Sequence, residues 1–289
     1  MEDAKSNLED EMGNDKWGGP WTQAKIEIFI KYLQAYLEIM KRQRFKLIYF
    51  DGFAGSGKIA SGSDYSSLIE SVALQVLGIE KPTSFDLYYL VELNEKKAIR
   101  LKKIIQEKFP DKKNVFVVAK DCNDKLVSLS NYLRKYKYFR ALAFVDPHGM
   151  EVNWSSLEVF AELGCDIWIL VPTGIGVNRM LIRNGAIQIA WIKKLEKFLG
   201  LSEEELKSRF YKEKKSMTLF GEETSTLKEE KAVQKIIELY TEQLHKIWRF
   251  VSKPYPMKNS TGSIMFHFLL ASQSPAGKKI ADEIIGKMN

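Results

Sequence analysis

The stretch LIYFDGFAGSGKIASG, residues 47–62, decides the fold, because a buried-type apolar run passes directly into a glycine-rich turn. Two kinds of ligand-binding loop begin this way. One is a P-loop, in which Gly52, Gly57 and Lys58 would be the first glycine, the second glycine and the lysine. The other is the turn after the first strand of a Rossmann-like sheet, where an acid such as Asp51 precedes glycines that admit a ligand close to the backbone.

Short apolar runs alternate with helical patterns on both sides of this stretch. Strands are expected at 46–51, 86–92, 114–121, 141–146 and 166–172. Helices are expected at 21–41, 66–78, 95–108, 125–136 and 154–163. This alternation predicts an α/β fold in which helices cover both faces of a mostly parallel sheet.

The C-terminal part of the chain breaks this rhythm. Residues 175–247 are lysine-rich and mostly helical in pattern, with a polar loop around 214–227, and are interpreted as a helical insertion. Two further strands, 248–255 and 263–272, flank a turn-forming segment and predict an antiparallel β-hairpin before a last helix at 275–288. We therefore expect a flexible N-terminal tail, 1–20, and one domain, 21–289.

Composition restricts the class of protein. The 289 residues carry a net charge of +7, which permits a polyanionic partner, and 45% are hydrophobic, enough for a sizeable core. The two cysteines, Cys122 and Cys165, are too few for a disulfide scaffold or a four-cysteine zinc site. No apolar run reaches the roughly 18 residues that span a bilayer, and the start of the chain is polar and acidic. We expect a soluble, cytoplasmic protein without a metal site.

The residue after Lys58 argues against a P-loop. That position requires a serine or threonine hydroxyl to bind magnesium, and here it is Ile59. Asp146, at the end of a later strand, is the candidate for the second magnesium residue. A nucleoside triphosphatase with a P-loop-like site therefore stays open as the less favoured alternative.

The strand ends instead favour S-adenosylmethionine (SAM) as the cofactor. Ligands of open parallel sheets bind at the carboxyl ends of the strands. Glu92 ends the second strand, where a carboxylate accepts hydrogen bonds from ribose hydroxyls, and Asp121 follows the third strand, near the expected adenine. The predicted cofactor-binding residues are Asp51, Gly52, Phe53, Gly55, Gly57, Glu92, Asp121 and Cys122.

Several motifs resemble those of the three-Cys-motif partner protein family, which is methyltransferase-like. They are WTQAK, DGFAGSG, FVDPHG followed by Trp154, VNR at 177–179, and the closing hairpin. The resemblance covers nearly the whole chain from Trp21. It implies a class I SAM-dependent methyltransferase fold and a partner protein with three cysteines, encoded nearby. It also leaves open a methyltransferase-like binding protein that has no activity of its own.

The motif FVDPHGM, 144–150, partly resembles the D-P-P-[YF] motif of enzymes that methylate exocyclic amines of nucleic acid bases. In that chemistry a carboxylate and a carbonyl orient the amine, and positioning supplies most of the rate. Asp146 and Pro147 match the motif, whereas His148 replaces the second proline and Gly149 stands where the aromatic residue would be. The predicted catalytic residues are Asp146, Pro147 and His148, and the predicted reaction is methyl transfer to an amine of a nucleic acid.

Other residues are interpreted with an alternative beside each. Asn178 and Arg179 are predicted to bind substrate, although Arg179 would equally suit a surface ion pair. Lys25 faces either the cofactor or solvent. The lysines of 207–215 and 243–258 form either a solvated basic face or a nucleic acid surface, with Trp248, Phe250 and Tyr255 as stacking partners.

Overall fold

The computed structural model describes residues 20–60, 68–182, 185, 187–218, 221–228 and 231–288. Residues 1–19 of the predicted tail lie outside this part of the chain, as does most of the segment that follows the glycine-rich turn. Among the described helices, none has both the length and the apolar composition needed to cross a membrane.

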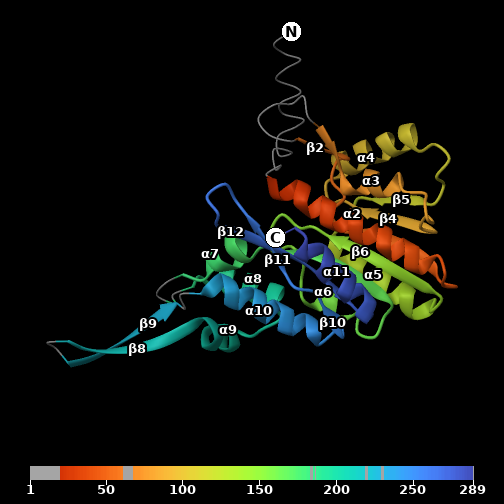
Figure 1. Ribbon diagram of the computed structural model, residues 1–289. Coiled ribbons are helices and arrows are strands. Elements are labelled where there is room, and N and C mark those ends of the chain that lie inside the picture. The colour runs from red at the N-terminus through yellow and green to blue at the C-terminus, as the bar shows by residue number, and fades with distance from the viewer. Residues whose placement is uncertain are drawn as a thin grey trace, which may run out of the picture.

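An eight-stranded sheet forms the centre of the protein (Figure 1). Its strands are β1 (Lys46–Asp51), β4 (Leu87–Val91), β5 (Val115–Val118), β6 (Phe139–Val145), β7 (Cys165–Val171), β10 (Phe250–Val251), β11 (Tyr255–Lys258) and β12 (Ile264–Ser272). The order is β10-β12-β7-β6-β1-β4-β5, and β11 also pairs with β12. Strands β1, β4, β5, β6 and β7 are parallel, whereas β12 is antiparallel to β7. This is the Rossmann-like class I methyltransferase fold, so the predicted fold is confirmed.

Helices cover both faces of the sheet, because its strands carry apolar side chains on alternate sides. In β1, Phe50 packs into one core and Tyr49 into the other. On the Phe50 face lie α5 (Cys122–Lys135), α6 (Ser155–Glu158), α8 (Ile189–Leu199), α9 (Glu203–Phe210) and α10 (Ala232–His245). On the Tyr49 face lie α2 (Pro20–Met40), α3 (Val72–Leu77), α4 (Glu95–Lys108) and α11 (Pro275–Gly286).

Helix α2 runs diagonally across the molecule (Figure 1). Its apolar residues recur at three- and four-residue steps, and Phe29, Leu33 and Leu37 are completely buried. Its opposite side carries an exposed ion pair between Glu27 and Lys31, whose charged atoms are 2.6 Å apart. The helix therefore buries one face and brings residues near its start to the edge of the sheet where the parallel strands end.

Three predicted elements are partly wrong. The helix expected at 154–163 is shorter, because α6 covers only Ser155–Glu158. The helix expected at 66–78 is shorter, because β3 (Leu68–Glu70) pairs with β2 (Lys58–Ala60) before α3 begins. The strand expected at 248–255 is divided into β10 and β11, since Pro254 between them has no N–H to donate.

The insertion is not only helical. It contains the π-helix η1 (Thr173–Val177), the short helix α7 (Asn178–Met180), and α8, α9 and α10. In place of the polar loop, β8 (Tyr211–Thr218) and β9 (Gly221–Lys228) form an antiparallel hairpin that extends away from the body of the protein (Figure 1). Threonine and serine on both strands suit extended backbone, but only the cross-strand pairing fixes it.

Candidate functional site

The glycine-rich turn after β1 lies across the ends of both neighbouring strands. The N–H of Gly52 donates to the carbonyl of Phe144 in β6, at 2.9 Å, and the N–H of Ala54 donates to the carbonyl of Val91 in β4, at 2.8 Å. Strand β1 lies between β4 and β6, where the chain order of the sheet reverses. Open α/β sheets bind their ligands in this position.

Two glycines of the turn have different reasons to be glycine. A Cβ added to Gly52 would lie 2.7 Å from Sγ of Cys122, so the backbone needs a residue without a side chain there. Gly55 has a left-handed φ of +65°, and nothing lies within 4 Å of the position of its missing Cβ. The turn is therefore packed against Cys122 on one side and open at Gly55 on the other.

Glu92 joins this turn to the end of β4. One carboxylate oxygen accepts a hydrogen bond from the N–H of Gly55 at 3.0 Å, and the other accepts one from the N–H of Asn94 at 2.8 Å. Each carboxylate oxygen has a second lone pair. Glu92 thus keeps the capacity to accept hydrogen bonds from a ligand while it holds the turn in place.

Asp51 is buried beneath the same turn. It accepts hydrogen bonds from the hydroxyl of Tyr49 at 3.1 Å and from the N–H of Phe53 at 3.0 Å. Burial is the main reason that the pKa of Asp51 is raised to about 7, and the charges of Asp146 and Glu92 act in the same direction. Three carboxyl groups therefore share this edge of the sheet, an arrangement that favours a cationic ligand.

Asp121 caps helix α5, where it accepts a hydrogen bond from the N–H of Asn123 at 2.8 Å. The side chain of Asn123 reaches into the loop after β6: its oxygen accepts from the N–H of Asn153 at 2.7 Å, and its nitrogen donates to the carbonyl of Glu151 at 2.9 Å. Asn123 was not predicted. A polar side chain in the first turn of a helix that follows a strand end is the signal for it.

Cys122, at the start of the same helix, is buried. Burial raises the pKa of its thiol, with a further contribution from the charge of Asp121. A protonated thiol packed under Gly52 shapes the turn and is a poor nucleophile.

Lys25 and Asp146 form an ion pair between α2 and the end of β6, across 121 residues of sequence. The side chain of Lys25 is 6% exposed and that of Asp146 is 22% exposed. The solvated alternative for Lys25 is therefore wrong, while a position facing the cofactor stays a prediction. Lys25 holds the carboxylate that the sequence motif marks as catalytic.

The residues after Asp146 form a tight loop. Pro147 is buried and His148 is exposed. The N–H of Gly149 donates to the carboxylate of Glu151 at 2.7 Å, which closes the loop. His148 thus stands at the surface of the loop beside the candidate site, and its catalytic role stays a prediction.

Asn178 and Arg179 lie in α7, which follows β7 through η1. The carbonyl of Asn178 accepts a hydrogen bond from the ammonium of Lys228 at 2.6 Å, so the end of β9 is tied to this short helix. Arg179 is exposed. Strand β7 is the neighbour of β6, which places this segment after the next strand end along from Asp146. A role in substrate binding stays a prediction for both residues.

The structure contradicts the P-loop alternative. Lys58 begins β2, in which Ile59 pairs with Ile69 of β3. A P-loop instead leads its lysine into the first turn of a helix, whose N-terminus binds the phosphates.

The prediction that Trp248 stacks on a nucleic acid base is also wrong. It is fully buried, and its ring N–H donates to the carbonyl of Cys165 at 2.8 Å. A base therefore has no access to this ring.

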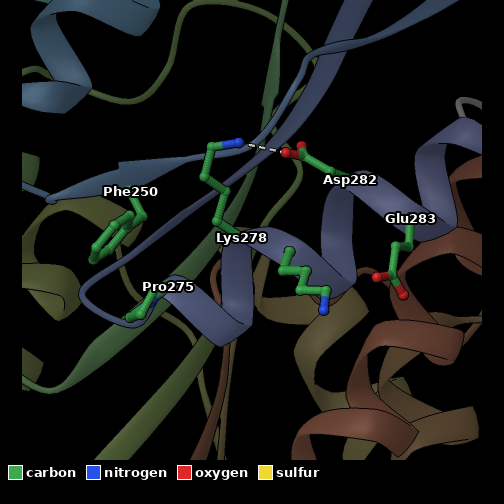
Figure 2. A pocket seen from close by; sticks show the side chains of 6 residues that line it. Phe250, Pro275, Lys278, Asp282 and Glu283 are labelled. Atoms are coloured by element: carbon green, nitrogen blue, oxygen red, sulfur yellow. Dashed lines mark hydrogen bonds and ion pairs between the residues drawn. The ribbon is translucent and has the colours of Figure 1, made fainter.

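A separate groove lies beside β10 and α11, next to the edge of the sheet where β7 begins (Figure 2). Two of its lining residues, Lys278 and Asp282, lie one turn apart on α11 and form an ion pair. Its lining residues are Phe250, Pro275, Lys278, Lys279, Asp282 and Glu283. None of the predicted cofactor-binding or catalytic residues is among them, so the groove is not part of the candidate site.

Comparisons with known proteins give structural neighbours only. No family model matches the chain, and no curated protein matches it. Protein LPL1258 from Legionella pneumophila is 16% identical, with a TM-score of 0.43 over 89% of this chain and 98% of that one. Trm1 from Pyrococcus horikoshii, solved with SAM, is 10% identical, with a TM-score of 0.42 over 95% and 72%. A spermidine synthase solved with the transition-state analogue AdoDATO is 14% identical, with a TM-score of 0.40 over 91% and 65%.

Proposed function

We propose that this chain is a SAM-dependent methyltransferase that methylates an amine of a nucleic acid. The observation that carries the proposal is the cluster of Asp51, Glu92 and Asp146 at adjacent strand ends, beside a glycine turn that is open at Gly55. A cationic sulfonium, an ammonium group and two ribose hydroxyls suit these acceptors. Glu92 would hold the ribose, Asp121 would lie near the adenine, and Asp51 with Gly55 and Gly57 would hold the methionine end.

Bound SAM would supply an electrophilic methyl group: the nitrogen–methyl bond forms as the sulfur–methyl bond breaks, S-adenosylhomocysteine leaves, and the amine loses one proton to solvent. Asp146 suits the acceptor side of this reaction, because its carboxylate accepts a hydrogen bond from an amine and directs the nitrogen lone pair. Lys25 holds one carboxylate oxygen of Asp146 and leaves the other for the substrate. We assign Lys25 as a positioning residue, since it acts through Asp146.

The Lys25–Asp146 pair also bears on the resemblance to three-Cys-motif partner proteins. It joins two of the motifs on which that resemblance rests, WTQAK and FVDPHG. The contact thus explains why a lysine in the first motif and an aspartate in the second would occur together. The partner with three cysteines that the resemblance implies is included in the proposal and is tested below.

Calorimetric titration of the purified protein with SAM tests the cofactor. We expect micromolar binding that Glu92→Ala weakens at least ~10-fold, a loss of about 1.4 kcal/mol. Glu107→Ala is the matched control, since Glu107 is an exposed carboxylate on α4 and should leave binding unchanged. Equal binding by the wild type and Glu92→Ala would contradict the assigned ribose contact.

Transfer of a labelled methyl group from SAM to pooled RNA and DNA tests the acceptor, without and then with the three-cysteine partner. Label in nucleic acid supports the proposal. SAM binding without label under either condition would reduce the function to that of a binding protein. Label found only in protein or in small molecules would show that the methyl acceptor is not a nucleic acid.

A further inference from the structure

Two basic segments meet at the edge of the sheet where the parallel strands begin, opposite the candidate site. They are 41–46 (KRQRFK) and 131–140 (NYLRKYKYFR), together called here the amino-edge patch. The N–H of Lys46 donates to the carbonyl of Tyr138 at 2.9 Å, and Lys46 pairs with Phe139 as β1 and β6 begin. The two segments therefore form one continuous surface on rigid elements.

The patch is strongly positive. Neither segment contains an acidic residue. Within the described part of the chain, two neighbouring acids form close ion pairs with it: Glu38 with Lys41 at 2.6 Å, and Asp86 with Lys46 at 2.9 Å. Its exposed cations are Lys41, Arg42, Arg44, Lys46, Arg134, Lys135 and Lys137. Seven cations less these two acids leave +5, a charge that attracts a polyanion.

Aromatic rings stand among these cations. Tyr138 is 52% exposed, while Tyr132 and Tyr136 are half-buried. The rings brace one another: the centroids of Tyr132 and Tyr136 are 4.7 Å apart, and those of Tyr138 and Phe139 are 4.8 Å apart. The ammonium of Lys135 lies 5.2 Å from the ring centroid of Tyr136. The patch thus offers aromatic surface held in place beside positive charge.

We propose that the amino-edge patch binds single-stranded nucleic acid, with phosphates on its lysines and arginines and an unpaired base on Tyr138. Braced aromatic rings within a basic surface are how such strands are bound, because every base has a face that stacks. The patch is distinct from the candidate methyl-transfer site, since the seven residues of β6 separate the two edges by about 20 Å. Its binding does not depend on the proposed cofactor.

Fluorescence anisotropy with labelled 20-nucleotide RNA and DNA strands, at 50 and 200 mM salt, tests the proposal. Lys135→Gln combined with Lys137→Gln should weaken binding at least ~10-fold and lower the salt slope by about 1.4. Tyr138→Ser should weaken binding roughly 5-fold with the slope unchanged, because it removes stacking and no charge. The matched control, Lys193→Gln with Lys194→Gln on α8, removes the same exposed charge elsewhere and should change nothing.

Four results would overturn the proposal. They are no binding by the wild type, an equal loss in the α8 control, an unaltered affinity in the amino-edge variants, and retention on phosphatidylserine vesicles without oligonucleotide binding. Thermal melts establish that each variant is folded. Titration of the same variants with SAM separates this proposal from the proposed function, because the amino-edge variants should keep full SAM affinity.

Discussion

Helix α2 contacts one carboxylate where the parallel strands end and another where they begin, and the two contacts differ in chemistry. Near its start, the ammonium of Lys25 pairs with Asp146 at the end of β6. Seven residues later, the hydroxyl of Tyr32 donates to Asp166 in β7 at 2.9 Å, and Ser272 donates to the same carboxyl at 2.6 Å. Burial raises the pKa of Asp166 to about 6.

The two carboxylates therefore have different roles. Asp146 belongs to the candidate site, whereas the hydrogen bonds among Tyr32, Asp166 and Ser272 form a structural contact, called here the clip. Asp166 accepts hydrogen bonds from two neutral hydroxyls, which tie α2, β7 and β12 together. Asp146 has a cation on one oxygen and stands beside two other carboxyl groups. Both aspartates are partly exposed, so the charged surroundings, and not exposure, distinguish them. A carboxylate whose charge is balanced but whose surface is accessible is suited to bind a substrate.

The largest expected effect separates these two carboxylates by activity. Asp146→Asn should lower methyl transfer at least ~100-fold, because it removes the acceptor that orients the amine, while SAM affinity stays within ~3-fold. Asp166→Asn is the matched control and should keep the wild-type rate. Both rates are measured by label transfer at saturating SAM. Similar losses in the two variants would remove the distinction between site and clip.

A double-mutant cycle tests the ion pair itself. Lys25→Met leaves a partly buried carboxylate without its cation and should cost about 1–3 kcal/mol of unfolding free energy. Adding Asp146→Asn should recover part of that loss, since no unpaired charge then remains. Urea denaturation of the wild type, both single variants and the double variant gives the coupling energy. An additive double variant would mean that the pair contributes nothing to stability.

Asp51 combines features of the two carboxylates. Its hydrogen-bond donors are neutral, as for Asp166, but it lies in the candidate site, as Asp146 does. With a pKa of about 7, it is mostly protonated at pH 6 without ligand. A cationic ligand favours the ionised form, so binding releases a proton and affinity rises with pH. SAM affinity should increase roughly 5-fold from pH 6 to pH 7 and roughly 10-fold from pH 6 to pH 8, above which it levels off. Asp51→Asn should remove this dependence, and an unchanged pH profile in that variant would show that another group titrates.

The smallest expected effect concerns the clip. Tyr32→Phe removes one donor to Asp166 and should cost about 1 kcal/mol of unfolding free energy. SAM affinity should not change, since the clip lies at the far edge of the sheet. Urea denaturation and SAM titration of the same preparation measure both quantities. Weaker SAM binding would show that the clip communicates with the site.

The elements of the fold that depend on local sequence were predictable. Helix α4 has the expected bounds, since Asn94 caps its start through a hydrogen bond to the N–H of Lys97. The glycine turn and Glu92 were found because strand ends carry their signals within a few residues. The parallel direction of the first five strands was predicted from the alternation of strands and helices, whereas their order in the sheet comes from the structure.

Contacts between distant residues were not predictable from those signals. Nothing near Lys25 in the sequence indicates a carboxylate 121 residues away, and an amphipathic helix ordinarily exposes its lysines. The hairpin of β8 and β9 depends on cross-strand pairing, which a polar composition does not reveal. The amino-edge patch likewise arises only when β1 and β6 become neighbours.

The position of α2 also bears on the order in which the protein is made. This helix leaves the ribosome before every strand of the sheet, yet its polar partners are Asp146 and Asp166, and Ser272 completes the clip. The tertiary contacts of α2 therefore cannot form until nearly the whole chain has been synthesised. Its apolar face has no partner until the strands of the sheet are made, and its contact with Asp166 is completed only once β12, the last strand, has entered the sheet.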